Sequence, residues 1–177
     1  EYRMSLFRTR NAKAYDFAYW GSIKSKTAGG EKSGDDRHLV LNKLSKKLHC
    51  YWIGRYGSGI KADMKMTSMM KAVDFIKQAN ATLCFNWIDP TATTARYHEA
   101  IACDVIPMVW QDYDSMNTLV ADKWQRCETT QEAIEKILSL NKETFKSKLE
   151  MIQQHYQPAN REEFHSLFAQ LMNKALS

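Results

Sequence analysis

An arginine and a glutamate, Arg96 and Glu99, stand three residues apart near the start of a predicted threonine-capped helix over 93–103. Residues i and i+3 share a helix face, so the two side chains should point the same way. The start of a helix carries free N–H groups and partial positive charge, which makes Arg96 suited to a diphosphate. Glu99, one turn deeper, can accept the hydroxyls of a ribose. The pair favours a nucleotide-sugar ligand; the alternative is an exposed intrahelical ion pair.

A second group of candidates follows the predicted strand 15–20. Ligands of open α/β sheets gather at the carboxyl ends of strands. There Gly21 would let a ligand approach the backbone, and Ser22 could donate to a phosphate. Lys24, and Arg37 at the start of the next helix, could neutralise its charge. The alternative is a surface loop with incidental lysines.

Two further elements should reach the same edge of the sheet. Gly54 ends the predicted strand 50–53 and either faces a sugar or base or simply makes a turn. Thr67 begins a predicted helix over 67–79, whose backbone could bind the edge of a uracil with Met69 beside the ring. A methionine at helical spacing is also typical of the core.

Metal-binding patterns are weak in this chain. Asp112 and Asp114 form a D-x-D that could hold a divalent cation, Mg or Mn, beside a diphosphate. The position before a predicted short helix over 114–121 favours Asp114 as a helix cap instead. The five histidines lack metal-ligand spacing, and the four cysteines, without a CxxC pair, indicate reduced thiols. We therefore expect no resident metal or cofactor.

The alternation of elements predicts an α/β fold, a Rossmann-like parallel sheet with helices on both faces. Further strands are expected at 81–85 and 105–110, and a helix at 37–47. The apolar side of that helix should carry Leu39, Val40, Leu44 and Leu48. A C-terminal helical extension is expected at 131–140, 142–156 and 160–176.

The pattern changes divide the chain into three parts: a linker or the end of a preceding element at 1–14, a nucleotide-sugar-binding domain at 15–128, and C-terminal helices packing on it at 129–177. The chain has no run of 18 apolar residues, so no membrane span is expected, and no signal peptide is evident. Both observations favour the cytoplasm. The chain begins without Met, which suggests a fragment or a processed product. Its net charge of +5 leaves DNA open as a partner.

From 15 onward the chain resembles the C-terminal, donor-binding half of GT-B glycosyltransferases. Within that group it is most similar to the bacteriophage β-glucosyltransferases that glucosylate 5-hydroxymethylcytosine in DNA. The resemblance rests on the following motifs: Tyr19-Trp20-Gly21-Ser22-x-Lys24, the strand closed by Gly54, Thr94-x-Arg96-x-x-Glu99, and Ala102-x-Asp104-Val105.

The resemblance implies UDP-glucose or another nucleotide sugar as the donor. Ser22, Lys24 and Arg37 would meet the diphosphate with Arg96, and Glu99 would hold the ribose. Thr67 and Met69 would lie near the uracil, and Thr94 belongs to the same motif as Arg96. Lys24 stands where that family has an arginine, and an insertion over 26–34 separates it from Arg37.

The resemblance also implies that an N-terminal Rossmann-like half is missing from this chain. In the family that half supplies the catalytic carboxylate base, so the catalytic residue is unknown here. A phage-encoded protein would work in the host cytoplasm. Two other functions remain open: another GT-B enzyme, acting on a saccharide or lipid or as a sugar-nucleotide epimerase, and a non-enzymatic basic module that binds nucleic acid.

Overall fold

The computed structural model describes residues 13–23, 33–56, 60–65, 69–85, 94–111 and 113–156; for 22–23, 33–36, 55–56 and 69–71 it describes the backbone only. The elements, in chain order, are β1 (Tyr15–Ile23), α2 (Ser33–Ser45), β2 (Cys50–Tyr56), α3 (Met69–Ile76), β3 (Ala79–Cys84), α4 (Ala95–Ala102), β4 (Ile106–Trp110), the 3-10 helix η1 (Lys123–Gln125), β5 (Arg126–Cys127), α5 (Thr130–Leu138) and α6 (Lys142–His155).

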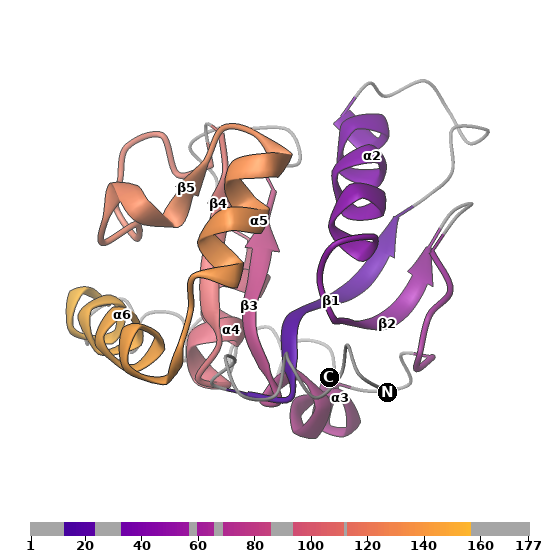
Figure 1. The fold of residues 1–177 in the computed structure, drawn as a ribbon, viewed down its shortest axis with the longest axis horizontal. Helices are drawn as coiled ribbons and strands as arrows, with labels where there is room; N and C mark the ends of the chain where they lie inside the picture. The colour runs from indigo at the N-terminus through magenta and orange to yellow at the C-terminus, as the bar shows by residue number, and fades with distance from the viewer. Residues whose placement is uncertain are drawn as a thin grey trace, which may run out of the picture.

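The strands form one sheet in the order β2-β1-β3-β4-β5, and every neighbouring pair is parallel (Figure 1). This confirms the predicted α/β class. From β1 the chain crosses through α2 to β2 on one side, whereas from β3 it crosses through α4 to β4 on the other. The boundary between β1 and β3 is therefore the topological switch point, where open α/β sheets bind their ligands.

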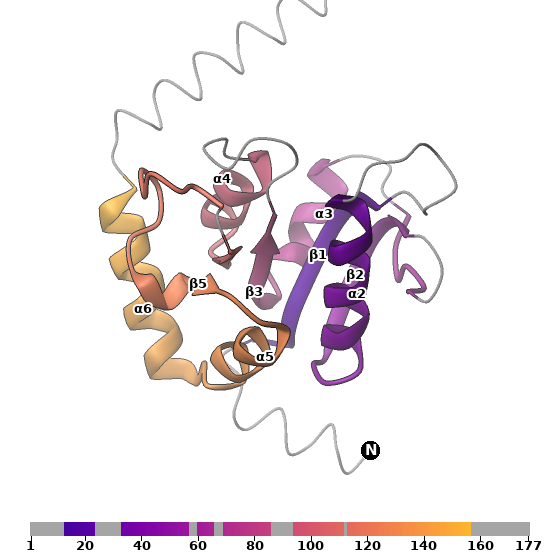
Figure 2. The same ribbon diagram turned by 90° about the horizontal axis from the view of Figure 1, so that it is seen from above.

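Helices cover both faces of the sheet, with α2 and α5 on one face and α3 and α4 on the other (Figure 2). The first face buries Leu41 and Leu44 of α2 against aromatic residues of β1 and against Ile137 of α5. The second face buries Ala72 and Ile76 of α3 with Ala100 of α4. β3 is buried along its whole length, as a strand covered on both faces should be, although Asn80 and Thr82 are polar.

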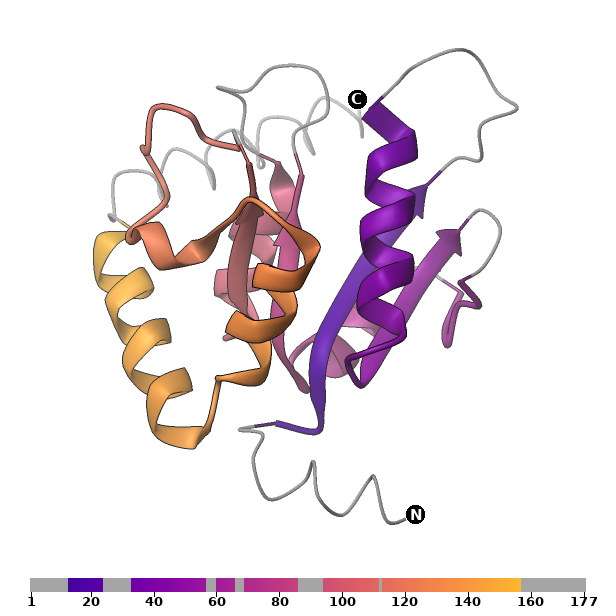
Figure 3. The ribbon, with the colours of Figure 1, turned by 45° about the horizontal axis from the view of Figure 1, so that its top comes forward.

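The switch point is also where the sheet opens. β1 pairs with β2 from Phe17 as far as Ile23, but it pairs with β3 only at Tyr15 and Phe17. Beyond that point the carboxyl ends of β1 and β3 diverge (Figure 3). The last residues of β1 are therefore accessible to side chains from α4, the helix that follows β3.

The loop after β4 differs from the prediction. Within 113–121 the structure has turns and no helix, so the helix expected over 114–121 is wrong. Asp114 is not a helix cap: its φ is +49°, and its carboxylate accepts hydrogen bonds from the backbone N–H groups of Leu119 and Val120. The short pairing of β5 with β4 was also missed, because two residues give no period.

Two smaller expectations were wrong. β2 does not end at Gly54 but continues to Tyr56. Leu39, which was expected on the apolar side of its helix, is 58% exposed, and Leu41 is buried in the core instead. The helix expected over 160–176 lies outside the described residues.

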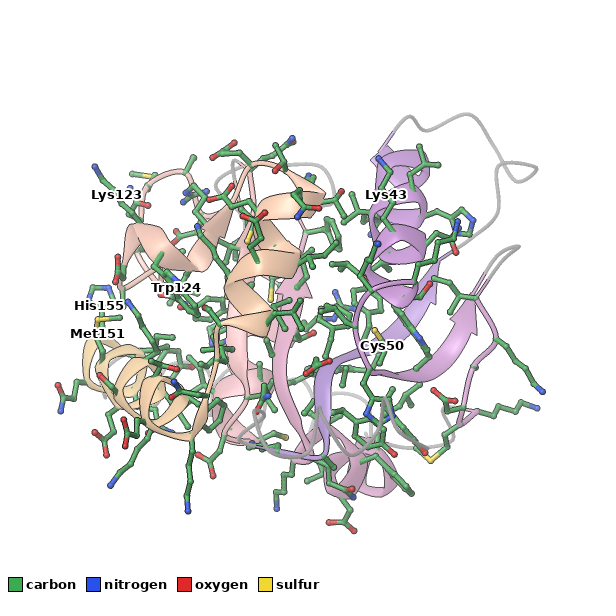
Figure 4. The ribbon with its side chains drawn as sticks, viewed as in Figure 1. Lys43, Cys50, Lys123, Trp124, Met151 and His155 are labelled. Carbon is green, nitrogen blue, oxygen red and sulfur yellow. The ribbon has the colours of Figure 1, made fainter. Side chains whose placement is uncertain are left out.

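The C-terminal helices pack on the sheet through the same core as α2. Phe145, Leu149 and Ile152 of α6 belong to that cluster. Nζ of Lys148 in α6 lies over the ring of Trp124 in η1, 4.9 Å from the ring centre; Trp124 is labelled in Figure 4. None of the helices in the described ranges combines the length and apolar character that crossing a bilayer requires.

Candidate functional site

Two glycines at the carboxyl ends of β1 and β2 shape the candidate site. Gly21 and Gly54 are paired in register, with φ of +119° and +133°. A Cβ on Gly54 would lie 1.7 Å from the Gly21 carbonyl oxygen, so only glycine fits there. A Cβ on Gly21 would lie 3.1 Å from Nη2 of Arg96. Gly21 thus allows the arginine to approach the backbone of β1.

Arg96, in the first turn of α4, reaches across the opening between β1 and β3. Its Nη2 donates to the carbonyl oxygen of Trp20 at 2.5 Å, and its Cζ lies 4.0 Å from the centre of the Tyr19 ring, a cation–π contact. Its Nε is buried and has no hydrogen-bond partner in the described part of the chain. An unsatisfied buried donor costs about 1–3 kcal/mol, so the guanidinium retains capacity for an acceptor.

Glu99 lies one turn further along α4 and is also half-buried. Its Oε2 accepts a hydrogen bond of 2.6 Å from Nε1 of Trp20. Both Arg96 and Glu99 lie within the described ranges, and there they form no ion pair with each other. The exposed intrahelical ion pair, the alternative for these two residues, is therefore wrong: both are directed to Trp20 at the end of β1.

The start of α4 is held by a tyrosine. The backbone N–H of Thr94 donates to the hydroxyl of Tyr113 at 2.7 Å, and Oγ1 of Thr94 lies 3.3 Å from the same hydroxyl. Thr94 is the N-cap residue, but its side chain makes no capping hydrogen bond. The expected cap position is thus confirmed, but the side chain of Thr94 accepts no hydrogen bond from the first turn of α4.

The remaining predicted residues are placed less completely. Arg37 lies in α2, whose N-terminus follows β1, and is half-buried. The backbone of Ser22 is in β1 and that of Met69 begins α3, but their side chains are not described. Lys24 and Thr67 lie outside the described residues. The structure therefore brings together Gly21, Gly54, Arg96 and Glu99, with Thr94 at the start of the same helix.

Among the residues that the structure describes, the titratable groups around this cluster do not form a nucleophile and base. Burial raises the pKa of Cys84, at the end of β3, to about 12, although the Arg96 charge opposes the shift. The thiol is therefore neutral near pH 7. Burial lowers the pKa of His98, and its Nδ1 pairs with the Tyr156 hydroxyl at 2.6 Å, away from Glu99.

The described residues contain no cluster of three or more histidine, cysteine, aspartate or glutamate side chains that could hold a metal ion. Asp112 of the D-x-D lies outside them. The carboxylate of Asp114 is already occupied by the backbone and hydroxyl of its own loop.

Three aromatic residues of the site were not among the predicted residues. Trp20 contacts both charged side chains, Tyr19 stacks under the guanidinium, and Tyr113 holds the start of α4. For two of them a signal was present, because Tyr19 and Trp20 stand directly before Gly21 in the first motif. Tyr113 gave none, since its partner lies 19 residues away in sequence.

No protein-family model matches the chain, and no curated protein matches its sequence. Among solved structures, the DNA-modifying enzyme β-glucosyltransferase, studied with and without uridine diphosphoglucose, is 18% identical over 91% of this chain, with a TM-score of 0.64. T4 phage β-glucosyltransferase with UDP-glucose is 19% identical over 89% of the chain (TM-score 0.63), and the same enzyme with UDP and Mn²⁺ is 18% identical over 89% (TM-score 0.64).

The chain spans about half the length of these structures, between 48% and 52%. At such low identity the likeness concerns the fold. The resemblance expected from the motifs is confirmed at that level: this chain has the fold of about one half of a GT-B β-glucosyltransferase.

Proposed function

We propose that this chain is the donor-binding half of a glycosyltransferase that transfers glucose from UDP-glucose. The observation that carries the proposal is the placement of Arg96 and Glu99 at the switch point, held on the last residues of β1 rather than paired with each other. Solved structures of the same fold contain UDP-glucose or UDP, which supports a uridine nucleotide here. 5-Hydroxymethylcytosine in DNA is the favoured acceptor, because the similar enzyme is DNA-modifying.

In this proposal the guanidinium of Arg96 and the N–H groups at the start of α4 bind the diphosphate. The buried Nε of Arg96 would gain a phosphate oxygen as its acceptor. Glu99 would accept the ribose hydroxyls. The approach of Arg96 over Gly21 lets the phosphates lie against the backbone of β1. Lys24 and Arg37 would add positive charge, and Thr67 and Met69 would contact the uracil.

The reaction would be a direct displacement at the anomeric carbon of glucose. The acceptor hydroxyl attacks, and the bond to the diphosphate breaks with its electron pair on the leaving oxygen. Arg96 and the α4 N-terminus stabilise that developing charge, which is the principal contribution a donor half can make to the rate. We propose that the base that deprotonates the acceptor lies in a second Rossmann-like half outside these 177 residues.

Calorimetric titration with UDP tests the donor site directly. Arg96→Ala should weaken UDP binding about 10- to 100-fold, because it leaves the phosphate charge unpaired. Arg126→Ala is a matched control, since Arg126 is another half-buried arginine near the carboxyl edge but donates to Tyr113 O and Asn117 Oδ1 of the loop after β4. It should keep the UDP affinity. Unchanged affinity in Arg96→Ala would reject the assignment.

The acceptor requires a separate assay. The chain together with its proposed N-terminal half should transfer labelled glucose to DNA that contains 5-hydroxymethylcytosine, but not to unmodified DNA. Transfer to saccharides or lipids instead would support another GT-B enzyme. DNA binding with a steep salt dependence and no response to UDP would support the basic nucleic-acid-binding module.

A further inference from the structure

Trp20 forms hydrogen bonds with both charged side chains of the candidate site. Its carbonyl oxygen accepts from Nη2 of Arg96 at 2.5 Å, and its indole Nε1 donates to Oε2 of Glu99 at 2.6 Å. The side chain is 2% exposed and packs with Ala18, Ile53 and Ala100, between β1 and α4. The ring is therefore held by both layers.

The bond to the indole constrains the glutamate more than packing alone would. An indole N–H is a donor only, and a buried ring cannot turn to offer it elsewhere. With Oε2 committed to this donor, the carboxylate is restrained to positions that keep this bond. Oε1 has no hydrogen-bond partner among the residues that the structure describes. It is therefore available to a donor that arrives from the open end of β1.

A pair of neighbouring hydroxyls needs such an oriented acceptor. The 2′ and 3′ hydroxyls of a ribose lie side by side and donate in fixed directions, so a freely rotating glutamate would bind them at an entropic cost. A site built to bind a hydroxyl discriminates strongly against the analogue that lacks it, because the buried acceptor is left unpaired.

We propose that Trp20 is a positioning residue that sets Glu99 for the ribose diol and so determines the preference for ribonucleotides over deoxyribonucleotides. This inference rests on the proposed function, in which Glu99 meets the ribose. A purely structural Trp20 would instead use Glu99 only to satisfy its own buried N–H. The two roles differ in one respect: only the first makes the loss of the indole N–H selective for the ligand's hydroxyls.

The test compares UDP with 2′-deoxy-UDP in Trp20→Phe, which keeps an aromatic ring and removes the donor. We expect UDP affinity to fall about 5- to 10-fold, the effect of losing the orientation that one hydrogen bond provides. The affinity for 2′-deoxy-UDP should change less than twofold, so the ribose preference shrinks. Trp52→Phe is the matched control, because Trp52 is buried on β2 in register with Tyr19 but belongs to the other core cluster. It should leave the preference intact.

An equal loss for both nucleotides in Trp20→Phe, or an unchanged ratio, would overturn the inference. If the wild-type protein binds UDP through Arg96 but Trp20→Phe keeps the ratio, only the role of Trp20 fails. If the wild-type protein binds neither nucleotide, the proposed function fails with it.

A measurement on the wild-type protein covers the case in which Trp20→Phe does not fold. The indole N–H resonance of Trp20 should shift when UDP is added and should shift less with 2′-deoxy-UDP, because the ribose hydroxyls share its acceptor. A resonance that responds equally to the two nucleotides, or to neither, would overturn the inference.

Discussion

Two polar clusters lie beyond the carboxyl ends of the sheet, and they use their charges in different ways. In the first, Arg96 and Glu99 are held on Trp20, and the buried Nε of Arg96 has no acceptor in the described residues. In the second, the carboxylate of Asp114 accepts from Thr118, Leu119 and Val120 of the loop after β4.

The second cluster is complete without a ligand. The guanidinium of Arg126 donates to backbone oxygens of the same loop, among them those of Tyr113 and Asp114. Three residues there adopt positive φ without being glycine, a conformation that these bonds stabilise: Gln111, Asp114 and Asn117. Charged side chains whose hydrogen bonds all go to the neighbouring backbone stabilise a loop, whereas charged side chains with remaining hydrogen-bonding capacity can bind a ligand. This contrast separates the two clusters more clearly than their sequences do.

The largest effect is expected from Gly54→Ala, beside the first cluster. The new Cβ would lie 1.7 Å from the Gly21 oxygen and would force a strained positive φ. We expect the free energy of unfolding to fall by at least about 3 kcal/mol, together with loss of UDP binding. Chemical denaturation would measure it. A stable protein with normal UDP affinity would show that the glycine pair does not shape the site.

Asp114→Asn should be next in size and should act on stability alone. An amide would place N–H donors against backbone N–H groups, which costs about 2–4 kcal/mol. Affinity for UDP should change less than twofold in the folded protein. A large loss of UDP affinity at normal stability would break the comparison, since it would place Asp114 in the donor site.

The pH dependence of unfolding gives the same residue a second test. Burial raises the pKa of Asp114, but hydrogen bonds from Thr118, Leu119 and Val120 outweigh it and hold the pKa below its ordinary value. A lowered folded-state pKa means that the stabilisation is present above the unfolded-state pKa and is lost as the pH falls through the folded-state pKa. Wild-type stability should therefore drop below about pH 4, and Asp114→Asn should show a smaller drop.

Arg96→Met should have the smallest effect on stability. The substitution loses the contact with the Tyr19 ring and the bond to Trp20, but it also removes a half-buried charge with an unsatisfied Nε. These contributions oppose each other, so we expect a change within about 1 kcal/mol. Denaturation curves of Arg96→Met and Arg126→Met should differ clearly, with the second less stable. Equal losses would mean that both arginines are structural.

The fold and half of the site could be predicted from local patterns. Apolar strands separated by helices of about ten residues specify a parallel sheet, and the i, i+3 spacing places Arg96 and Glu99 on one face of α4. The helix expected over 114–121 failed because the loop after β4 is held by distant partners such as Arg126, which leave no periodic signal. The side chain of Thr94 lies at the cap position of α4 but makes no capping hydrogen bond, and its contact with the distant Tyr113 hydroxyl leaves no local signal either.

Local sequence patterns specify which residue types follow each strand and which of them share a helix face. Long-range packing alone separates β1 from β3 after Phe17 and Ala81, places Arg96 over Gly21, and joins Trp20 to both members of the pair. The two kinds of contact differ in their separation along the chain. Spacing along a helix is set within one turn, whereas a hydrogen bond across 79 residues exists only after the sheet and the helix have packed.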